Sequence, residues 1–328
     1  MRKILIVLMA GLFITTNTYL FAAGNAEESA TKVHILKLGI NTPEKSVRGT
    51  MAKTFKDEVE KNTNGRYKFD LYYGETLGSE PEQLEGVKVG SQDFTIAGAT
   101  LLGAMNPVFN AMTLPFMVSS FDDAHQKLDG SIGQYWDSKA PEYGYHILAK
   151  GDLGFNQITN NKHPINSLND MKGLNMRTPN DPLLIKTIQA LGASATPMSF
   201  SELYMALSQG VVDGQFNPVD AICQNKFNEV QKYLAHVNLS YITILLVSSE
   251  KFYSSLSPED QKIFTEAGLK AQETGREYAV KAEADYMKEI AKSMQVTEPD
   301  QKPFKNAVKS VYTDFEKGVD PEFAKLLK

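Results

Sequence analysis

The chain has 328 residues, 42% of them hydrophobic, and a formal net charge of -5. This length can bury one large core or two ordinary ones, and the acidic balance gives no chain-wide reason to bind nucleic acid or an anionic membrane. An anionic ligand would therefore need a local positive site. A single cysteine, Cys223, excludes an intrachain disulfide and a cysteine metal cluster, and its helical surroundings predict a small core residue.

Residues 1–24 have the pattern of a secretory signal peptide. The basic residues Arg2 and Lys3 precede an apolar run over residues 4–14, which is too short to span a bilayer, and small residues follow it. We expect cleavage between Ala22 and Ala26, which changes the net charge from -5 to -7 by removing the two basic residues. The run has no following cysteine for lipid attachment, so the sequence predicts an exported, periplasmic protein that is not embedded in a membrane.

Strands and helices alternate in the first half of the chain. The pattern predicts strands at 33–39, 67–71, 94–97 and 145–150. It predicts helices that begin at 47 and at 79, and a further helix near 120–136. Such alternation predicts a mostly parallel sheet that is covered by helices.

Two further strand-helix units occupy residues 169–218. In the first, a short strand at 174–176 delivers Arg177, and Asp181 with Pro182 opens a helix that Gly192 ends. In the second, Ser199 and Glu202 form a capping box at the start of a helix.

The rest of the chain suggests connections between two lobes. Residues 151–160 are expected to cross from one lobe to the other, and residues 239–247 to return. A helix from about 257 to 294 is longer than one small lobe, so it is expected to touch both, with bends allowed at Gly268 and Gly275. Short helices follow after Pro303. We therefore predict an α/β fold of two lobes around a ligand cleft, with lobe I at 31–154 plus 243–282 and lobe II at 155–242 plus 283–328.

Motifs for catalysis, cofactors or metals do not stand out. The five histidines are scattered, and the chain has no nucleophile elbow, phosphate loop or dinucleotide fingerprint. The acidic pairs Asp122-Asp123 and Glu80-Glu82 lie at helix starts, where they complement the helix dipole. No enzymatic activity, cofactor or metal is predicted.

Three positions in residues 169–218 are candidates for ligand contact. Arg177 ends a strand, where open α/β sheets place ligands, and its planar fork matches a carboxylate; a surface ion pair is the alternative. Asn217 precedes Pro218, so it either faces the cleft or forms a simple turn. Phe200 begins a helix and either contacts ligand or caps its own lobe.

Three blocks in this region resemble a known family. They are DMKGLNMRTPN (170–180), MSFSELYMALSQGVVDGQFNP (198–218) and NKFNEVQKYL (225–234), and they are similar to the DctP-like substrate-binding proteins of tripartite ATP-independent periplasmic (TRAP) transporters. The resemblance implies a type II periplasmic-binding-protein fold with a long helix bridging both lobes. It also implies that Arg177 binds a carboxylate, that Asn217 hydrogen-bonds the ligand and that Phe200 packs against it.

One departure from the family bears on the ligand. Members carry a second arginine in a GFR segment, whereas this chain reads Gly154-Phe155-Asn156-Gln157, so either Asn156 or Gln157 takes its place. A charge-assisted contact is lost in either case, which argues against a dicarboxylate. Gly98 occupies the position of the glutamate of sialic-acid binders, which argues against a sialic acid. Glu80 and Asn41 lie in first-lobe loops that resemble ligand-facing loops of the family.

The predicted function is that of an extracytoplasmic solute-binding protein. It would capture a small organic acid by lobe closure, as a monomer, and deliver it to the TRAP membrane permease subunits. Sugar acids such as uronates or aldonates are the first expectation for the ligand, followed by hydroxy or keto acids. The alternatives are a ligand-binding component of a membrane sensor and a secreted enzyme.

Overall fold

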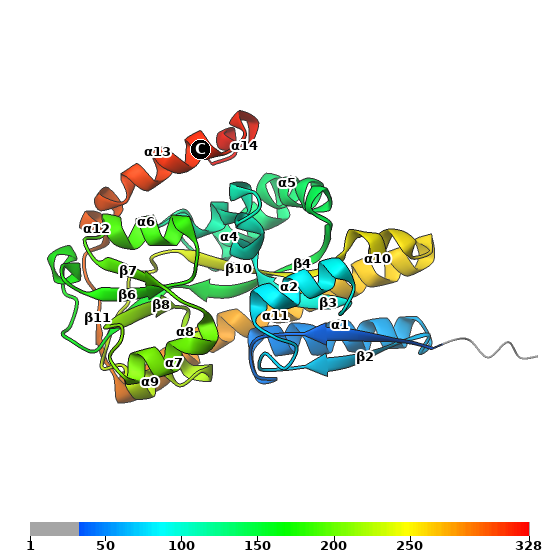
Figure 1. The fold of residues 1–328 in the computed structure, drawn as a ribbon, viewed down its shortest axis with the longest axis horizontal. Helices are drawn as coiled ribbons and strands as arrows, with labels where there is room; N and C mark the ends of the chain where they lie inside the picture. Colours follow the sequence, from blue (N-terminus) through cyan, green and yellow to red (C-terminus); the bar gives the residue numbers. More distant parts are fainter. Residues whose placement is uncertain (1–32, 328) are drawn as a thin grey trace, which may run out of the picture. The chain divides into compact units, whose positions relative to one another are not determined.

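The computed structural model describes residues 33–327, which form two β-sheets surrounded by helices (Figure 1). The predicted signal peptide lies outside the described residues.

The first sheet has five strands in the order β2-β1-β3-β10-β4. β1 pairs in parallel with β2 and β3, whereas β10 runs antiparallel to β3 and β4. The strands are β1 (His34–Gly39), β2 (Tyr67–Tyr72), β3 (Phe94–Gly98), β4 (Tyr145–Phe155) and β10 (Tyr241–Ser249). The predicted parallel arrangement therefore holds for the N-terminal strands only, because the last two strands are the connections to the second sheet.

The second sheet has six strands in the order β11-β9-β5-β8-β6-β7. β6 runs parallel to β7 and β8, so the carboxyl ends of these strands meet at one edge. The strands are β5 (Gln157–Asn160), β6 (Asn175–Thr178), β7 (Ser194–Pro197), β8 (Gly214–Asn217), β9 (Tyr233–Ala235) and β11 (Gln295–Thr297).

Helices pack around both sheets (Figure 1). Those next to the first sheet in the chain are α1 (Val47–Asn62), α2 (Glu80–Val89), α3 (Ala99–Gly103), α4 (Phe121–Asp129), α5 (Ser131–Lys139) and α10 (Glu250–Ser255). Those within the second region are α6 (Pro182–Ala190), α7 (Phe200–Ser208), α8 (Val219–Gln224) and α9 (Phe227–Val230). The single helix predicted near 120–136 is wrong, because the non-helical backbone of Gly130 divides it into α4 and α5.

Two short strand connections join the sheets. β4 and β5 are separated by one residue, Asn156, and residues 236–240 lead back from β9 to β10. The connections are hydrogen-bonded to each other, since the Asn156 amide donates to the Ser240 carbonyl over 2.8 Å and the Leu239 amide donates to the Asn156 carbonyl over 3.0 Å. Asn156 is therefore the point at which the chain changes sheets.

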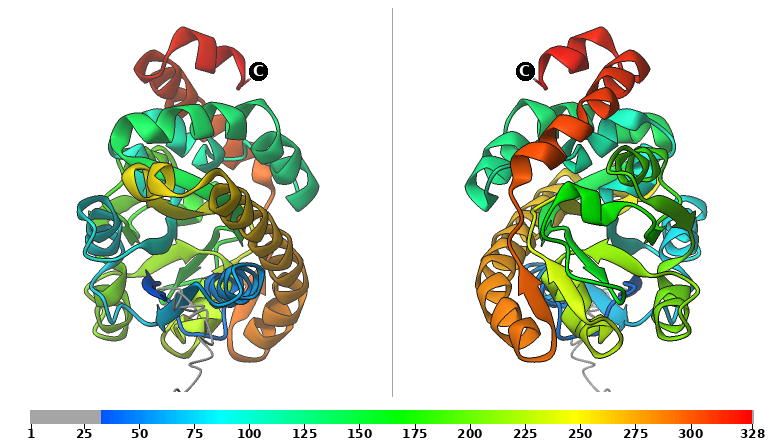
Figure 2. Two further views of the ribbon diagram at one scale, coloured as in Figure 1. Left: turned by 90° about the vertical axis from the view of Figure 1, so that its right-hand side faces the viewer. Right: turned by 90° about the vertical axis from the view of Figure 1, so that its left-hand side faces the viewer.

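The long helix α11 (Pro258–Ser293) is a third connection, and its curved path is visible in Figure 2. Phe264 packs in the core of the first sheet, and Ile290 packs in a cluster with residues of α7 and α8. The helix continues through Gly268 and Gly275, which are needed for close packing. A Cβ atom on Gly268 would lie 2.3 Å from the Leu148 carbonyl oxygen, and one on Gly275 would lie 2.4 Å from Met51 Cγ.

The C-terminal helices contact elements beside both sheets. They are α12 (Gln301–Ala307), α13 (Lys309–Gly318) and α14 (Pro321–Lys325). The Tyr312 hydroxyl donates to the Pro115 carbonyl over 2.8 Å, and the ring of Phe323 lies 4.8 Å from that of Tyr135 on α5. On the other side, Lys186 of α6 pairs with Asp314 of α13 at 3.1 Å. The predicted lobe bounds, which assign this segment to lobe II, stay a prediction.

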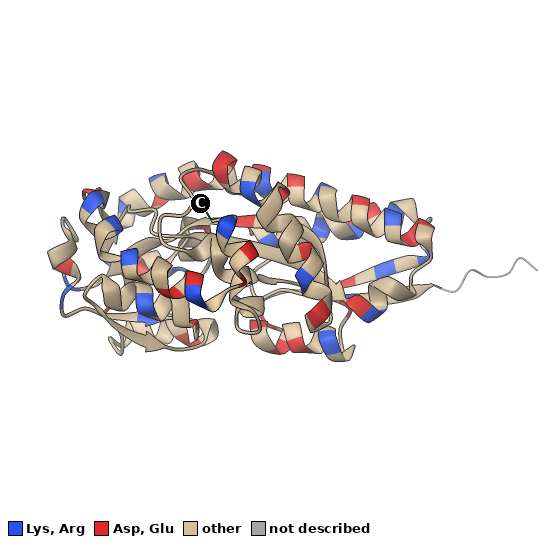
Figure 3. Ribbon diagram, turned by 90° about the horizontal axis from the view of Figure 1, so that it is seen from above, with Lys and Arg blue, Asp and Glu red and all other residues tan. Residues whose placement is uncertain are grey.

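Acidic and basic residues are interspersed along the outer helices in Figure 3. No helix within residues 33–327 is both long and apolar enough to cross a membrane.

Candidate functional site

Arg177 is held in the interior by the strand that carries it. The nearby residues Leu174 and Met176 are buried in the core, and Arg177 itself is only 4% exposed. The Nε and Nη2 groups both donate to the Met198 carbonyl oxygen, over 3.2 and 2.9 Å. The sequence placed this arginine at the carboxyl end of a strand, and β6 confirms that placement.

These two bonds leave part of the guanidinium available. Arginine has five N–H donors, so three remain, and two of them lie on the edge formed by Nη1 and Nη2. Burial lowers the Arg177 pKa to about 10, against the opposing effect of the Glu80 and Glu202 carboxylates. The guanidinium therefore stays charged at neutral pH, with a neutral carbonyl and no carboxylate as its hydrogen-bond partner among the described residues.

Arg177 lines a cavity of about 100 Å³ between the two sheets. The cavity brings together six of the seven residues predicted for the site: Asn41, Glu80, Asn156, Arg177, Phe200 and Asn217. Its other walls are Arg48, Gly98, Thr100, Leu153, Pro179, Leu184, Phe216, Ala221 and Ile242.

Gln157 is the predicted residue that does not line this cavity. Its Nε2 donates to Asn238 Oδ1 over 2.6 Å, and its Oε1 accepts from the amides of Val237 and Asn238 over 2.9 and 3.0 Å. These contacts stabilise the connection between β9 and β10. Asn156, and not Gln157, therefore stands at the cavity wall.

Asn156 and Asn217 present neutral amide groups at the second-sheet side of the cavity. Asn156 is 2% exposed, and its Nδ2 donates to Ser240 Oγ over 2.9 Å. Asn217 ends β8 directly opposite Gln157 in the antiparallel pair with β5, and its amide bonds to the Gln215 side chain. Both side chains keep unused donor or acceptor capacity that a ligand could satisfy.

Phe200 is positioned by the start of α7. The predicted capping box is present, since the Glu202 carboxylate accepts from the Ser199 amide over 3.0 Å. The Phe200 ring packs edge-on to Phe227 at 5.7 Å, and the Arg177 guanidinium lies 5.8 Å from its centroid. The ring therefore contacts its own lobe and also forms part of the cavity wall beside the cation.

The opposite wall holds an ion pair that the sequence analysis did not identify. Arg48 Nη2 donates to Glu80 Oε1 over 2.8 Å. The same Glu80 oxygen accepts the Gly98 amide over 2.7 Å, and Glu80 Oε2 accepts from Asn41 Nδ2 over 3.0 Å. Arg48 lies in the first turn of α1, where a positive charge opposes the helix dipole. The unfavourable position of this charge is the feature of the sequence that could have identified Arg48 as a candidate site residue.

Asp220 provides a second acid near Arg48. It lies in the first turn of α8 and is 3% exposed. Burial raises the pKa of the Asp220 carboxyl to about 6, and the positive charge of Arg48 opposes that rise. Arg48 is thus compensated by Glu80 directly and by Asp220 through space, whereas Arg177 forms no ion pair within the described residues and interacts with Glu80 and Glu202 only through space.

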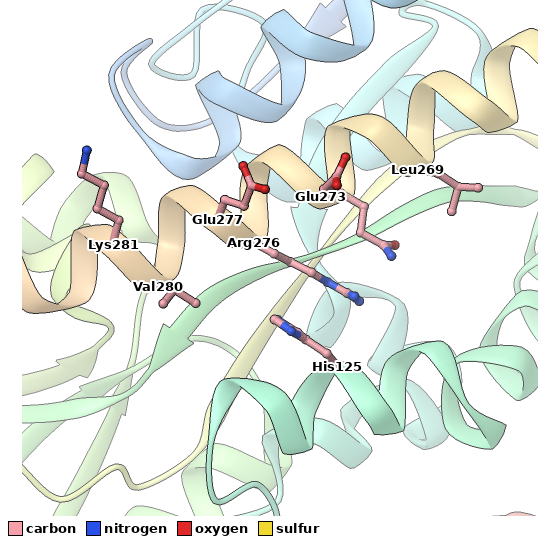
Figure 4. Close-up of a pocket in the computed structure, with 8 residues that line it drawn as sticks. His125, Leu269, Glu273, Arg276, Glu277, Val280 and Lys281 are labelled. Carbon is pink, nitrogen blue, oxygen red and sulfur yellow. The ribbon is translucent and has the colours of Figure 1, made fainter.

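A larger hollow of about 540 Å³ lies along the outer side of α11 (Figure 4). Apart from His125 of α4, every residue that lines it belongs to α11. Its arginine, Arg276, is engaged with Asp129 through two bonds of 2.7 and 2.9 Å. The guanidinium of Arg276 is therefore already paired with a carboxylate. No cluster that could bind a metal occurs within the described residues.

Two β-sheets covered by helices lie around a cavity. In this cavity a buried guanidinium, which has no ion-pair partner within the described residues, lies beside neutral amides. This arrangement is typical of solute-binding receptors. The model of the family described as bacterial extracellular solute-binding protein, family 7 (DctP) matches residues 38–318. The chain belongs to this family of TRAP-type receptors, which is a binding family and not a catalytic one.

Relatives with known names and structures agree with that assignment. The 2,3-diketo-L-gulonate-binding periplasmic protein YiaO of Escherichia coli (strain K12) is 32% identical over 318 residues, which cover 94% of this chain and 95% of that protein. A TRAP periplasmic solute-binding protein from Polaromonas sp. JS666, bound to D-erythronate, is 36% identical with a TM-score of 0.86, covering 90% of this chain and 98% of that one. Another from Sulfitobacter sp. NAS-14.1, with bound β-D-galacturonate, is 29% identical with a TM-score of 0.85, covering 89% and 98%.

Proposed function

We propose that the protein captures a small organic monocarboxylate by closing its two lobes, and that it delivers this acid to a TRAP membrane permease. The observation that carries the proposal is the buried Arg177, whose free Nη1/Nη2 edge lines the cavity while its other donors bind the Met198 carbonyl. A carboxylate fits that edge with two parallel charge-assisted hydrogen bonds. The export of the protein, its monomeric state and the absence of catalysis are parts of the same proposal.

The charges of the cavity favour one carboxylate over two. Arg48 forms an ion pair with Glu80 at 2.8 Å, and Asn156 is neutral, so only Arg177 among the described cavity residues offers a positive charge that is not already in an ion pair. A second carboxylate would enter the cavity without a cationic partner, and burial of an unpaired charge is costly.

Neutral hydrogen-bonding groups favour hydroxyl groups on the ligand. Asn41, Asn156, Asn217 and Thr100 surround the arginine without adding net charge, and amides and hydroxyls can both donate and accept. The ligands named for the relatives are erythronate, galacturonate and diketogulonate. We therefore place sugar acids first as ligand, followed by hydroxy and keto acids.

A thermal-shift screen of organic acids tests the proposal. A ligand at 100 times its Kd should stabilise the protein by about 2.7 kcal/mol. We expect D-erythronate and other hydroxy acids to raise Tm, and their amides to leave Tm unchanged, because the amides lack the charge that meets Arg177. Arg177→Ala should abolish the response.

The ligand-free Tm of the Arg177→Ala variant is the control for folding. Neutral sugars that stabilise the wild type as strongly as acids do would contradict the proposed role of Arg177. The same would follow if the folded Arg177→Ala variant kept its response to acids.

A further inference from the structure

A second chamber adjoins the carboxylate cavity. Its volume is about 410 Å³, within the range of ordinary ligand pockets. Five residues line both spaces: Glu80, Thr100, Arg177, Pro179 and Phe200. Arg177 therefore stands at the junction, so a carboxylate bound to its free edge has the small polar cavity on one side and the larger chamber on the other.

The walls of the second chamber differ in chemistry from those of the first. Leu84 and Tyr145 are buried beneath it, and Leu101, Ala104 and Met105 of the α3 region form another side. Met105 is 36% exposed and Ala104 is exposed, although both side chains are apolar. The surface of these side chains would be removed from water by an apolar group inside the chamber, which is favourable.

Four acids line the same chamber, Glu75, Glu80, Glu85 and Asp181, and Asp181 is the one that has a buried side-chain oxygen without a hydrogen-bond partner within the described residues. Asp181 is 4% exposed, and its Oδ1 caps α6 by accepting from the Leu183 amide over 2.8 Å. Its Oδ2 is buried and has no hydrogen-bond partner within the described residues. A buried acceptor without a partner is unfavourable, and a donor on a ligand in the chamber would remove that cost.

We propose that the second chamber is a specificity site for an apolar substituent of the acid whose carboxylate binds Arg177, and that a hydroxyl group on this substituent donates to Asp181. The ligand class is thus a hydroxy acid with an aliphatic extension that carries a further hydroxyl. This inference rests on the proposed function, because the substituent is placed by the carboxylate at Arg177.

Isothermal titration with 2-hydroxybutyrate, 2-hydroxyhexanoate and 2-hydroxyoctanoate tests the apolar part. Each methylene that enters the chamber should lower Kd by about two- to fourfold. Ala104→Phe places a ring in the chamber, so the ratio of the Kd of 2-hydroxybutyrate to that of 2-hydroxyoctanoate should fall to about one. The series on the wild-type protein remains decisive if this variant folds poorly.

The hydroxyl part is tested with 2,5- and 2,6-dihydroxyhexanoate against 2-hydroxyhexanoate. At least one of the two diols should bind about tenfold more tightly than the monohydroxy acid, as expected for a hydrogen bond to a charged group. Asp181→Asn keeps the Oδ1 acceptor of the helix cap but removes the Oδ2 acceptor, so it should abolish that gain.

D-erythronate measured in parallel separates this inference from the proposed function. If D-erythronate binds through Arg177 but the affinity of the 2-hydroxy acids does not rise with chain length, the apolar site is refuted and the proposed function stands. Equal affinity of the diols and 2-hydroxyhexanoate refutes the role of Asp181. If no acid binds, the proposed function fails and the inference fails with it.

Discussion

Two buried arginines face the cavity, and their hydrogen-bond partners give them different roles. Arg177 donates to the carbonyl oxygen of Met198, which orients the side chain without neutralising it. Arg48 donates to the Glu80 carboxylate, which orients the side chain and also compensates its charge. A backbone carbonyl is therefore the partner that leaves a guanidinium available to an anion.

The Glu80→Gln substitution should change the charge preference of the cavity. Glutamine keeps an oxygen that can accept the Gly98 amide, but it no longer compensates Arg48. We expect the ratio of the Kd of succinate to that of D-erythronate to fall by about tenfold or more, since a hydrogen bond to a charged group contributes about 1.5–3 kcal/mol. Titration calorimetry measures both constants.

Glu322→Gln is the matched control for Glu80→Gln, because that carboxylate is exposed on α14 and, among the described residues, pairs only with Lys325. It should leave the ratio unchanged. An equal ratio in the wild type and Glu80→Gln would show that Arg48 does not become available to a second carboxylate.

The sequence analysis named some of the residues that line the cavity and missed others, for identifiable reasons. Arg177 could be proposed for the site for two reasons: it ends a strand, which is a recognisable ligand position, and its block resembles the DctP-like family. The choice between Asn156 and Gln157 could not be made, because adjacent strand residues face opposite sides and a one-residue shift exchanges them. Arg48 was missed because its partner Glu80 is 32 residues away in the chain and belongs to another helix.

At the scale of the elements, α11 shows how glycine serves packing within a helix. Glycine in a helix interior costs about 1 kcal/mol relative to alanine, yet Gly268 and Gly275 both lie in α11. The absence of a side chain lets the helix approach the Leu148 carbonyl and the Met51 side chain. From the sequence, both glycines were equally compatible with bends, because the contacting atoms come from distant segments.

The Gly268→Ala substitution should destabilise the protein despite the better helix propensity of alanine. The added Cβ would lie 2.3 Å from a backbone oxygen, so the helix or β4 must shift. Overpacking of this kind costs about 1–3 kcal/mol. We expect a lower denaturation midpoint in urea with an unchanged slope.

Gly318→Ala is the control for this prediction. Gly318 is the last residue of α13, and a Cβ atom there would meet no described atom within 4 Å. This variant should be as stable as the wild type or slightly more stable. A stabilised Gly268→Ala protein would instead indicate that the packing of α11 on β4 adapts readily.

At the scale of the whole described region, one of the connections between the sheets contains Glu283, a carboxyl group whose charged form is disfavoured by burial. Glu283 belongs to α11, and a Cβ atom on Gly154, near the end of β4, would lie 3.4 Å from its Oε2. Burial raises the pKa of the Glu283 carboxyl from 4.5 to about 7, and the negative charge of Asp220 adds to the rise.

The Glu283→Gln substitution should therefore stabilise the protein in a pH-dependent way. Between pH 4.5 and 7 the unfolded chain loses the Glu283 proton while the folded protein retains it, so the wild type loses stability as the pH rises. Glutamine removes this loss. The stability of the variant relative to the wild type should rise from pH 5 to pH 8, by no more than about 3 kcal/mol. Urea denaturation at both pH values measures it, and a difference that does not change with pH would contradict the assignment.

The fold class could be predicted from the sequence, whereas the strand order within the two sheets could not. Alternating strands and helices predicted two α/β lobes, and the two sheets agree with that fold class. The antiparallel entry of β10 between β3 and β4 was not predicted, because strand order depends on pairings between residues that are far apart in the chain.

The single residue between β4 and β5 has a consequence for how recognition is coupled to motion. Asn156 connects the two sheets, and its side chain lines the cavity. Within this connection, a rotation of one sheet against the other must be absorbed within a few backbone torsions at or beside Asn156, while residues 236–240 and α11 must adjust with it. A ligand that hydrogen-bonds to the Asn156 amide would therefore contact a hinge residue directly, so no other residues are needed to couple ligand binding to motion of the hinge.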